Sequence, residues 1–455
     1  MPLVSINPAT GRLIRRYREA TTAQIDAAVD RAHTAFLSWR RDSLTGRARL
    51  LRKVAAVLRG RREDHALLIT SEMGKPLAQA RSEIEKCARV CEYYARHAAG
   101  FLAAERPVGA PENSRVVFQP LGVVLAVMPW NFPFWQAFRA VVPILAAGNT
   151  VLLKHASNVC GCALAIESVF REAGLPAGVF QTLLVGAERV PQLIAAAKVK
   201  AVTLTGSKEA GRKVASLAGA ALKKCVLELG GSDPYVILAD ADLDLAAEVC
   251  AQGRLINAGQ SCIAAKRMIV VEKVRAGFER RFVERMAARK MGPPTDLRTD
   301  LGPLARSDLR DELQAQVRKS LRRGARLLLG GKPLPGPGWF YPPTVLTDVR
   351  AGMPAYDEEL FGPVAAIVPV TDETAALAAA NNSDYGLGAA VFTRNRSHGR
   401  QIAIKELEAG VVFVNDYVRS DPSLPFGGIK QSGYGRELGP FGIREFVNVK
   451  TVVGG

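Results

Sequence analysis

Strand-like and helix-like segments alternate along the chain between residues 116 and 231. The strand-like segments are rich in β-branched and other apolar residues, and stretches with apolar residues at helical spacing separate them. They are VVFQPLGVVLAVMPW (116–130), NTVLLKHA (149–156), VFQTLLVG (179–186), AVTLTG (201–206) and KKCVLELGG (223–231). A run of strand–helix–strand units in this order requires a parallel sheet with helices on both faces. We therefore predict an α/β fold for this part of the chain.

A second α/β region follows Gly231. DPYVILADADLD (233–244) predicts a strand and a turn, and helical patterns flank the strand-like segment RMIVVEK (267–273). Near the end of the chain, AGVVFVND (409–416) is typical of a strand and EFVNVKTVV (445–453) of an edge strand. A chain of 455 residues is long enough for two or three domains with sizeable cores.

Composition narrows the class of protein. A content of 48% hydrophobic and 23% charged residues is that of a globular protein. The best apolar stretch, residues 121–147, is interrupted by prolines and an arginine, so we expect no membrane-spanning segment. The N-terminus lacks the apolar core of a signal peptide, and a cytoplasmic location is the default expectation.

The number and spacing of the cysteines and the distribution of charge exclude further classes of protein. Seven cysteines are an odd number in a long chain and argue against a disulfide framework. Neither Cys87 with Cys91 nor Cys160 with Cys162 has a matching pair at zinc-site spacing, so we expect no metal. The net charge of +18 is dispersed over helical stretches in which acids and apolar residues stand between the arginines. We therefore expect neither a nucleic acid nor a membrane as partner, and the charge favours anionic small molecules.

One cysteine differs from the others in its surroundings. NAGQSCIAAKR (257–267) places Cys262 among small and polar residues and follows it with two cations. A reactive thiolate needs backbone room and positive surroundings, and this segment offers both. Taken alone, the segment is better explained by a packed or surface thiol than by a reactive one.

Four further segments place polar or charged residues at the ends of predicted strands or in tight turns. They are MPWNFP (128–133) with Asn131, LLKHASN (152–158) with Lys154, LELGG (227–231) with Glu228, and EELFGPV (358–364) with paired acids. Ligands bind at the carboxyl ends of the strands in open α/β sheets. Each segment alone is also explained by a cap or a turn, but together they favour a site around Cys262.

In this order and spacing, the segments resemble the aldehyde dehydrogenase superfamily along essentially the whole chain, from Asn7 to Thr451. INPATG (6–11) and PFGGIKQSGYGRE (425–437) add to the resemblance, and WNFPFWQAFRAVVPILAAGN (130–149) is most similar to the bacterial succinate-semialdehyde dehydrogenases. The resemblance implies a homodimer or homotetramer of three-part subunits. These parts are a Rossmann-like dinucleotide-binding domain (1–112 and 129–230), an α/β catalytic domain (231–445), and a small β oligomerisation arm (113–128 and 446–455).

The resemblance implies that Cys262 is the nucleophile and attacks an aldehyde carbonyl to form a thiohemiacetal. The Asn131 amide and the backbone N–H of Cys262 would hold the oxyanion, and hydride transfer to a nicotinamide would leave a thioester. Glu228 would deprotonate the hydrolytic water. Relatives that transfer the acyl group to coenzyme A usually lack this glutamate, so Glu228 favours a free acid as product. Many succinate-semialdehyde dehydrogenases have a second cysteine where this chain has Ala264, so we expect no redox-switching disulfide.

The cofactor residues also follow from the resemblance. LTGSKEAG (204–211) is similar to the superfamily's variant of the dinucleotide fingerprint, with glycines at a strand-to-helix turn. The implied cofactor-binding residues are Trp130 and Phe361 near the nicotinamide, Gly206, Ser207 and Gly211 at the pyrophosphate turn, Lys154 and Ser157 at the adenosine ribose, and Glu359 at the nicotinamide ribose. Relatives that favour NAD often carry glutamate where this chain has Ser157, which predicts use of NADP, with NAD possible.

Arg139 and Ser420 are the expected substrate-binding residues. A buried arginine in the apolar run FWQAFRAVVPIL (134–145) needs an anionic partner. Succinate-semialdehyde dehydrogenases carry arginine here and a serine at the position of Ser420, so we expect oxidation of an ω-semialdehyde, above all succinate semialdehyde to succinate.

Three alternatives stay open. The first is an internal salt bridge for Arg139. The second is another short-chain or aromatic aldehyde as substrate, because some relatives have a second arginine where this chain has Ile256. The third is a catalytically silent binding protein of the same fold, although such proteins typically lose the nucleophile or the base.

Overall fold

A six-stranded sheet forms the centre of the N-terminal half in the computed structural model, which describes residues 3–454. Its strand order is β18-β8-β7-β4-β5-β6. The strands are β4 (Val123–Met128), β5 (Thr150–His155), β6 (Phe180–Thr182), β7 (Val199–Thr205), β8 (Lys224–Glu228) and β18 (Gly433–Tyr434). Neighbours from β8 to β6 are parallel, and β18, from the far end of the chain, is antiparallel to β8.

Helices connect these strands in the predicted order. They are α5 (Pro133–Ala146), α6 (Cys160–Glu172), α7 (Val190–Ala195) and α8 (Lys208–Ala220). The prediction of a parallel α/β sheet from the alternating pattern is therefore confirmed. Four helices precede the sheet in the chain: α1 (Thr22–Trp39), α2 (Leu44–Gly60), α3 (Arg62–Met73) and α4 (Leu77–Phe101). A short hairpin, β1 (Val4–Ile6) and β2 (Leu13–Arg16), comes before them.

The alternation of side chains along β4 explains why helices cover both faces of this sheet. Val124 and Ala126 belong to the core that contains α4 and α5, whereas Val123 and Leu125 belong to the core that contains α1. All four side chains are fully buried. Burial of a valine or leucine side chain stabilises the fold by about 1.5–3 kcal/mol. A strand buried on both faces has no polar side, which is why β4 is a continuous apolar run in the sequence.

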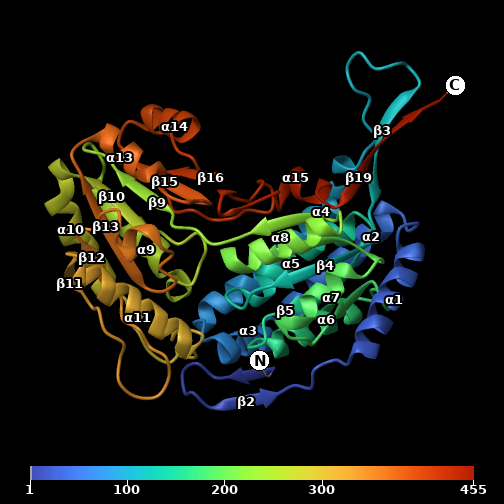
Figure 1. Ribbon diagram of the computed structural model, residues 1–455, viewed down its shortest axis with the longest axis horizontal. Coiled ribbons are helices and arrows are strands. Elements are labelled where there is room, and N and C mark those ends of the chain that lie inside the picture. The colour runs from blue at the N-terminus through green and yellow to red at the C-terminus, as the bar shows by residue number, and fades with distance from the viewer. Residues whose placement is uncertain (1–2, 455) are drawn as a thin grey trace.

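A seven-stranded sheet forms the second half, in the order β11-β12-β13-β10-β9-β15-β16. Its strands are β9 (Pro234–Ile237), β10 (Arg267–Val271), β11 (Arg326–Leu329), β12 (Thr344–Thr347), β13 (Val364–Val370), β15 (Gly388–Phe392) and β16 (Val411–Val414). Its main helices are α9 (Leu243–Leu255), α10 (Glu272–Ala287), α11 (Ser307–Arg322), α13 (Glu373–Asn381) and α14 (Arg396–Lys405). Figure 1 shows the two α/β bodies side by side, with the red C-terminal segment running from the second body to the first.

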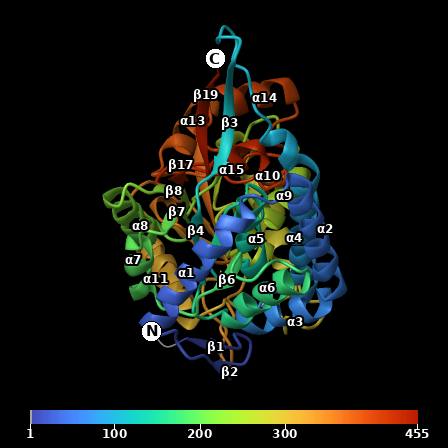
Figure 2. The same cartoon turned by 90° about the vertical axis from the view of Figure 1, so that its right-hand side faces the viewer.

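A two-stranded ribbon projects from the first body. It consists of β3 (Ser114–Pro120) and β19 (Val447–Val453), which pair antiparallel (Figures 1 and 2). The expected arm of residues 113–128 is too long, because β4 is a central strand of the six-stranded sheet. On the ribbon, Val449 and Val453 are 61% and 66% exposed. Exposed apolar side chains on a free strand edge are typical of a surface that pairs with another chain.

The part of the chain that the structure describes contains no helix long and apolar enough to cross a membrane. Within the same residues, no group of three His, Cys, Asp or Glu side chains is arranged to hold a metal ion. All seven cysteines are free thiols.

Candidate active site

A left-handed turn positions Cys262. Helix α9 ends at Leu255 and the short helix η2 (Ile256–Gly259) follows, in which Asn257, Ala258 and Gly259 have φ values of 54°, 52° and 75°. A side chain at Gly259 would place its Cβ 2.2 Å from the backbone oxygen of Gly362, so only glycine fits. Left-handed backbone is unfavourable for residues with side chains, and such strain persists where the surrounding structure fixes it.

Asn131 holds this turn from the neighbouring body. Its Nδ2 donates to the backbone oxygen of Gln260 at 3.1 Å, and its backbone oxygen accepts from Asn257 Nδ2 at 2.7 Å. Asn131 is buried, and Asn131 and Cys262 line the same cavity. Among residues 3–454, one of the two amide hydrogens of Asn131 has a protein acceptor, so the other is available to an oxygen in the cavity.

The surroundings of Cys262 hold its thiol in the protonated form. Desolvation raises the pKa of Cys262 to about 12, and the nearby cations Arg139 and Lys266 oppose this rise. The thiol form is a weak nucleophile, so the sulfur must lose its proton when it attacks a carbonyl.

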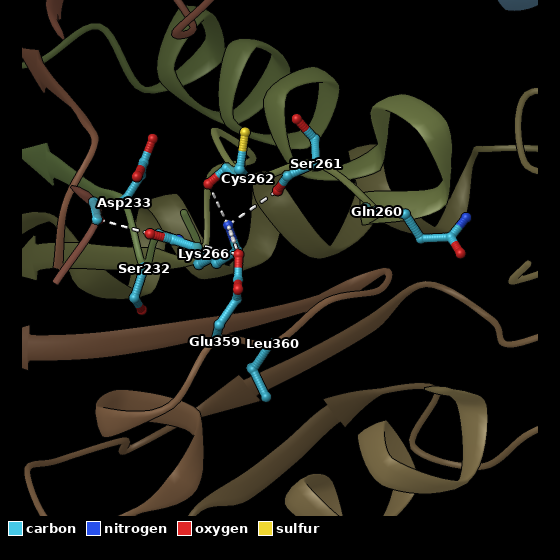
Figure 3. A network of polar contacts seen from close by, with 12 residues as sticks. Ser232, Asp233, Gln260, Ser261, Cys262, Lys266, Glu359 and Leu360 are labelled. Atoms are coloured by element: carbon cyan, nitrogen blue, oxygen red, sulfur yellow. Dashed lines mark hydrogen bonds and ion pairs between the residues drawn. The ribbon is translucent and has the colours of Figure 1, made fainter. Parts of the chain in front are cut away.

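Lys266 links the loop that carries Cys262 to Glu359. Its amine donates to the backbone oxygens of Ser261 and Cys262 at 3.0 and 2.7 Å and lies 3.3 Å from Glu359 Oε1. Figure 3 shows this amine between the loop and Glu359, with the Cys262 sulfur pointing away from it. Lys266 is 1% exposed, and burial lowers its pKa.

The glycines of LELGG make room for this arrangement. The backbone N–H of Gly231 donates to Glu359 Oε1 at 3.1 Å. A Cβ on Gly230 would lie 2.2 Å from Glu359 Oε2, and one on Gly231 would lie 2.7 Å from the backbone oxygen of Cys262. The two glycines therefore let Glu359 and the loop that carries Cys262 approach the end of β8 closely.

Glu228 lies at the end of β8 in a buried network of charges. Arg139 forms a salt bridge with Glu437, and its Nη2 lies 3.8 Å from Glu228 Oε2. The guanidinium also stacks on Phe426, 4.7 Å from the ring centroid. Burial raises the pKa of Glu228 and of Glu437, while Arg139 lowers both. Burial and the Arg139 guanidinium therefore act in opposite directions on the pKa of Glu228.

Arg139 therefore has an internal acidic partner. The internal salt bridge that the sequence left open for Arg139 is present in the structure. The prediction that Arg139 lies on a helix leading away from Asn131 is correct, because it is part of α5. The expectation that the buried guanidinium needs an anionic partner is met by Glu437 of the C-terminal segment, and contact of Arg139 with the substrate stays a prediction. Arg139 is 1% exposed and does not line the cavity of Cys262.

A cavity of about 520 Å³ runs from Cys262 to the first turn of α8. Of the expected site residues, those that line it are Trp130, Asn131, Gly206, Ser207, Cys262, Glu359 and Phe361. Trp130 and Phe361 meet edge to face with ring centroids 5.7 Å apart. Ser207 caps α8 by accepting from the backbone N–H of Ala210 at 3.3 Å, so the positive end of the helix faces the cavity.

The other expected cofactor residues do not line this cavity. Lys154 and Ser157 lie at the end of β5 and in the loop after it. Gly211 lies inside α8, where a Cβ would meet the Leu229 side chain at 2.5 Å, so it brings helix and strand end together. Ser420 lines a separate cavity and accepts a hydrogen bond from Lys86 Nζ at 2.8 Å.

Sequence reasoning did not assign roles to Lys266, Glu437 and Lys86. Lys266 was visible as one of the two cations after Cys262, and Glu437 belongs to the glycine-rich segment near the end of the chain. Lys86 lies in an ordinary amphipathic helix, α4, and no pattern in the sequence singles it out.

A cysteine thiol lies in a cavity at the edge of a parallel sheet. This arrangement is typical of a nucleotide-dependent oxidoreductase that works through a thiol. The model of the aldehyde dehydrogenase family matches residues 2–452. The chain therefore belongs to the aldehyde dehydrogenase family.

Individual relatives are similar to this chain over its full length. The NAD(P)+ succinate semialdehyde dehydrogenase Sad of Escherichia coli (strain K12) is 50% identical over 449 residues, which cover 99% of this chain and 97% of that protein. A probable NADP+ succinate-semialdehyde dehydrogenase of Synechocystis is 48% identical over 452 residues, covering 99% of both. Among solved structures, a succinic semialdehyde dehydrogenase from Streptococcus pyogenes in complex with NADP+ matches with a TM-score of 0.96 at 38% identity, covering 99% of both chains.

Proposed function

We propose that the protein oxidises succinate semialdehyde to succinate with NADP+. The observation that carries the proposal is one cavity that joins Cys262 and Asn131 to Trp130, Phe361 and the first turn of α8. Full-length relatives at about half identity, named as succinate semialdehyde dehydrogenases, support this choice of substrate.

The cavity fits a dinucleotide. Gly206 ends the turn after β7 and leaves the N-terminus of α8 open, where unpaired backbone N–H groups favour phosphate. Glu359 lies where its carboxylate can accept from ribose hydroxyls, and Gly230 gives it room. When bound, NADP+ supplies the hydride acceptor.

The residues of this chain divide the chemistry into two stages. Cys262 forms a bond from sulfur to the aldehyde carbon and loses its proton, while the Asn131 amide and the backbone N–H of Cys262 stabilise the oxyanion. Loss of hydride from that carbon leaves a thioester on Cys262. Glu228 then takes a proton from water, the water oxygen bonds to the acyl carbon, and the carbon–sulfur bond breaks to release the acid.

Steady-state assays of the purified protein test the proposed function. Succinate semialdehyde, glutarate semialdehyde, butanal and benzaldehyde are each assayed with NADP+ and with NAD+. We expect the highest kcat/KM with succinate semialdehyde and NADP+. A higher value for butanal or benzaldehyde would contradict the proposed substrate, and no turnover with any aldehyde would contradict the proposed activity.

Ser157 is expected to permit NADP+ because it is neutral and lies three residues after Lys154 at the end of β5. Replacing Ser157 with glutamate should lower kcat/KM for NADP+ about tenfold or more, because a carboxylate repels the 2′-phosphate. The value for NAD+ should change less than about twofold. Ser157→Ala is the matched control and should keep most NADP+ activity. A wild-type kcat/KM about tenfold higher for NAD+ than for NADP+ would show that Ser157 does not indicate the cofactor.

The ribbon of β3 and β19 supports a homodimer or homotetramer. Its exposed valines would be buried if the ribbon paired with a neighbouring subunit. We expect light scattering to give the mass of a dimer or tetramer, and the double variant Val449→Lys, Val453→Lys to give a smaller species. A monomer at micromolar concentration would refute this assembly.

The two sheets and the ribbon also define the domain boundaries that we propose. The dinucleotide-binding domain extends to residue 112 and includes 123–230, the catalytic domain is 231–445, and the ribbon comprises β3 with the C-terminal residues. The cytoplasmic location stays a prediction.

A further inference from the structure

Lys266 is a buried cation whose three N–H donors all have partners next to Cys262. These partners are the backbone oxygens of Ser261 and Cys262 and the Oε1 atom of Glu359. A lysine ammonium has three donors, so these three acceptors satisfy it completely. Lys266 does not line the cavity of Cys262. It therefore acts on a substrate in that cavity only through the groups that it holds.

The peptide group between Ser261 and Cys262 connects Lys266 to the reacting residue. The oxygen of this group is the Ser261 carbonyl, which accepts from the Lys266 amine at 3.0 Å, and its N–H is that of Cys262. All peptide bonds of the described residues are trans, so the N–H points away from the side on which the carbonyl meets the amine. Within residues 3–454, no backbone oxygen accepts from this N–H. It is therefore available to an oxygen of the substrate.

A cation bonded to the oxygen of a peptide group makes the N–H of that group a stronger donor. Amide resonance moves electron density from nitrogen to oxygen, and an ammonium at the oxygen favours this shift. Hydrogen bonds on the two sides of one peptide group therefore strengthen each other, and the effect is greater in a buried site of low dielectric constant. A donor to an oxyanion matters most in the transition state, where the negative charge develops.

The positions of the ammonium and of the loop that carries Cys262 are both fixed. The side-chain amides of Asn131 and Asn257 each donate to the backbone oxygen of Gln260 at 3.1 Å. The carbonyls of residues 260, 261 and 262 therefore all accept from side chains. Glu359 lies 3.3 Å from the ammonium and offsets the cost of burying its charge. Figure 3 shows the amine with its bonds to the loop, while the Cys262 sulfur points away from it.

We propose that Lys266 is a positioning residue that orients and polarises the peptide group between Ser261 and Cys262, so that the backbone N–H of Cys262 stabilises the oxyanion. The inference rests on the proposed function, in which this N–H and the Asn131 amide hold the oxyanion. The ammonium keeps its three protons throughout, and no bond to Lys266 forms or breaks.

Two reactions of the Cys262 thiol separate this role from other effects. Acylation by p-nitrophenyl acetate passes through a tetrahedral oxyanion, whereas alkylation by iodoacetamide is a displacement at a methylene carbon and forms none. Both reactions use the thiolate, so the ratio of their rates at one pH cancels a change in the pKa of the thiol. The initial release of p-nitrophenol measures acylation, and peptide mass spectrometry measures the alkylation of Cys262 and confirms that the acetyl group is on it.

Replacing Lys266 with methionine keeps the apolar stem and removes the cation. Loss of an oxyanion donor costs about 10²–10³-fold in rate. The donor is weakened here and not removed, so we expect the ratio of acylation to alkylation to fall about tenfold. Lys266→Gln, which keeps a donor without the charge, should lower the ratio about threefold, and it decides the test if Lys266→Met does not fold. An unchanged ratio in the folded variant would overturn the proposal.

Arg267→Met is the matched control, because Arg267 is also buried and donates only to backbone oxygens outside the loop that carries Cys262. These are the oxygens of Ser232, Ala379 and Ala380, at 2.9, 2.9 and 3.0 Å. We expect its ratio to stay within about twofold of the wild type, even where its stability falls. An equal fall of the ratio in Arg267→Met would show a general loosening of the site and overturn the role of Lys266.

The infrared spectrum of the acyl-enzyme provides a second readout. Hydrogen bonds to a carbonyl oxygen weaken the C=O bond and lower its stretching frequency. Succinate semialdehyde labelled at the aldehyde carbon with a heavy isotope identifies the thioester band in Glu228→Gln. We expect this band at higher frequency when Lys266→Met is added to Glu228→Gln. An identical frequency in the two proteins would contradict the proposal.

The two thiol probes need neither a semialdehyde nor NADP+, so they distinguish this inference from the proposed function. A wild type that reacts with both probes but does not oxidise succinate semialdehyde would contradict the proposed substrate, and the ratio would still decide the role of Lys266. A wild type in which p-nitrophenyl acetate leaves Cys262 unmodified would overturn Cys262 as the nucleophile, and the role of Lys266 with it.

Discussion

Replacing Cys262 with alanine is expected to lower the rate of NADPH formation by a factor on the order of 10⁴ or more. Among the described residues that line the cavity, Cys262 is the only cysteine, so the variant leaves no thiol there. The variant should still fold, since Cys262 is half-buried in a segment of small residues. Steady-state assays with succinate semialdehyde and NADP+ measure the effect.

Cys225→Ala is the control for this variant. Cys225 is also half-buried and lies on β8, the strand that carries Glu228. We expect it to keep near-normal turnover. Activity within about tenfold of the wild type in Cys262→Ala would rule out Cys262 as the nucleophile.

Replacing Glu228 with glutamine should separate the two stages of the reaction. We expect a burst of NADPH, close to one per active subunit, followed by a steady rate about 10²–10⁴-fold below that of the wild type. The reason is that the amide cannot accept a proton from water, whereas attack by Cys262 and loss of hydride still occur. Rapid-mixing absorbance measurements record the burst and the steady rate in one trace.

Glu167→Gln is the matched control for Glu228. Glu167 is a partly buried glutamate whose pKa burial also raises, but it lies on α6 and accepts from the backbone N–H of Thr182 at 3.2 Å. Its variant should turn over without a burst. A wild-type steady rate in Glu228→Gln would show that another group deprotonates the hydrolytic water.

The sequence predicts those features that depend on local pattern. The strand-like runs around Val124 and Leu152 are strands because their apolar residues are buried on both faces of a parallel sheet. The small residues around Cys262 indicate a turn, and the structure has such a turn at Ala258 and Gly259, with Cys262 lining a cavity.

The sequence does not predict contacts between distant segments. Arg139 is an unpaired charge in its own helix, and only the return of the C-terminal segment across β8 brings Glu437 to it. The boundary between ribbon and sheet depends on distant segments for a similar reason: β3 and β4 are adjacent β-rich runs, and only their partners, β19 and β7, separate them. Lys86 differs from the other cations of α4 only in the partners that tertiary structure gives it, Trp135 and Ser420.

In the proposed reaction, Cys262 forms a thioester with the oxidised semialdehyde and Glu228 promotes its hydrolysis. Mass spectrometry of Glu228→Gln after incubation with succinate semialdehyde and NADP+ tests this claim most directly, because slow hydrolysis lets the acyl-enzyme accumulate. We predict that the intact subunit gains the mass of one succinyl group and that peptide mapping places it on Cys262. An unmodified subunit after a full burst, or a succinyl group on another cysteine such as Cys225, would contradict the account.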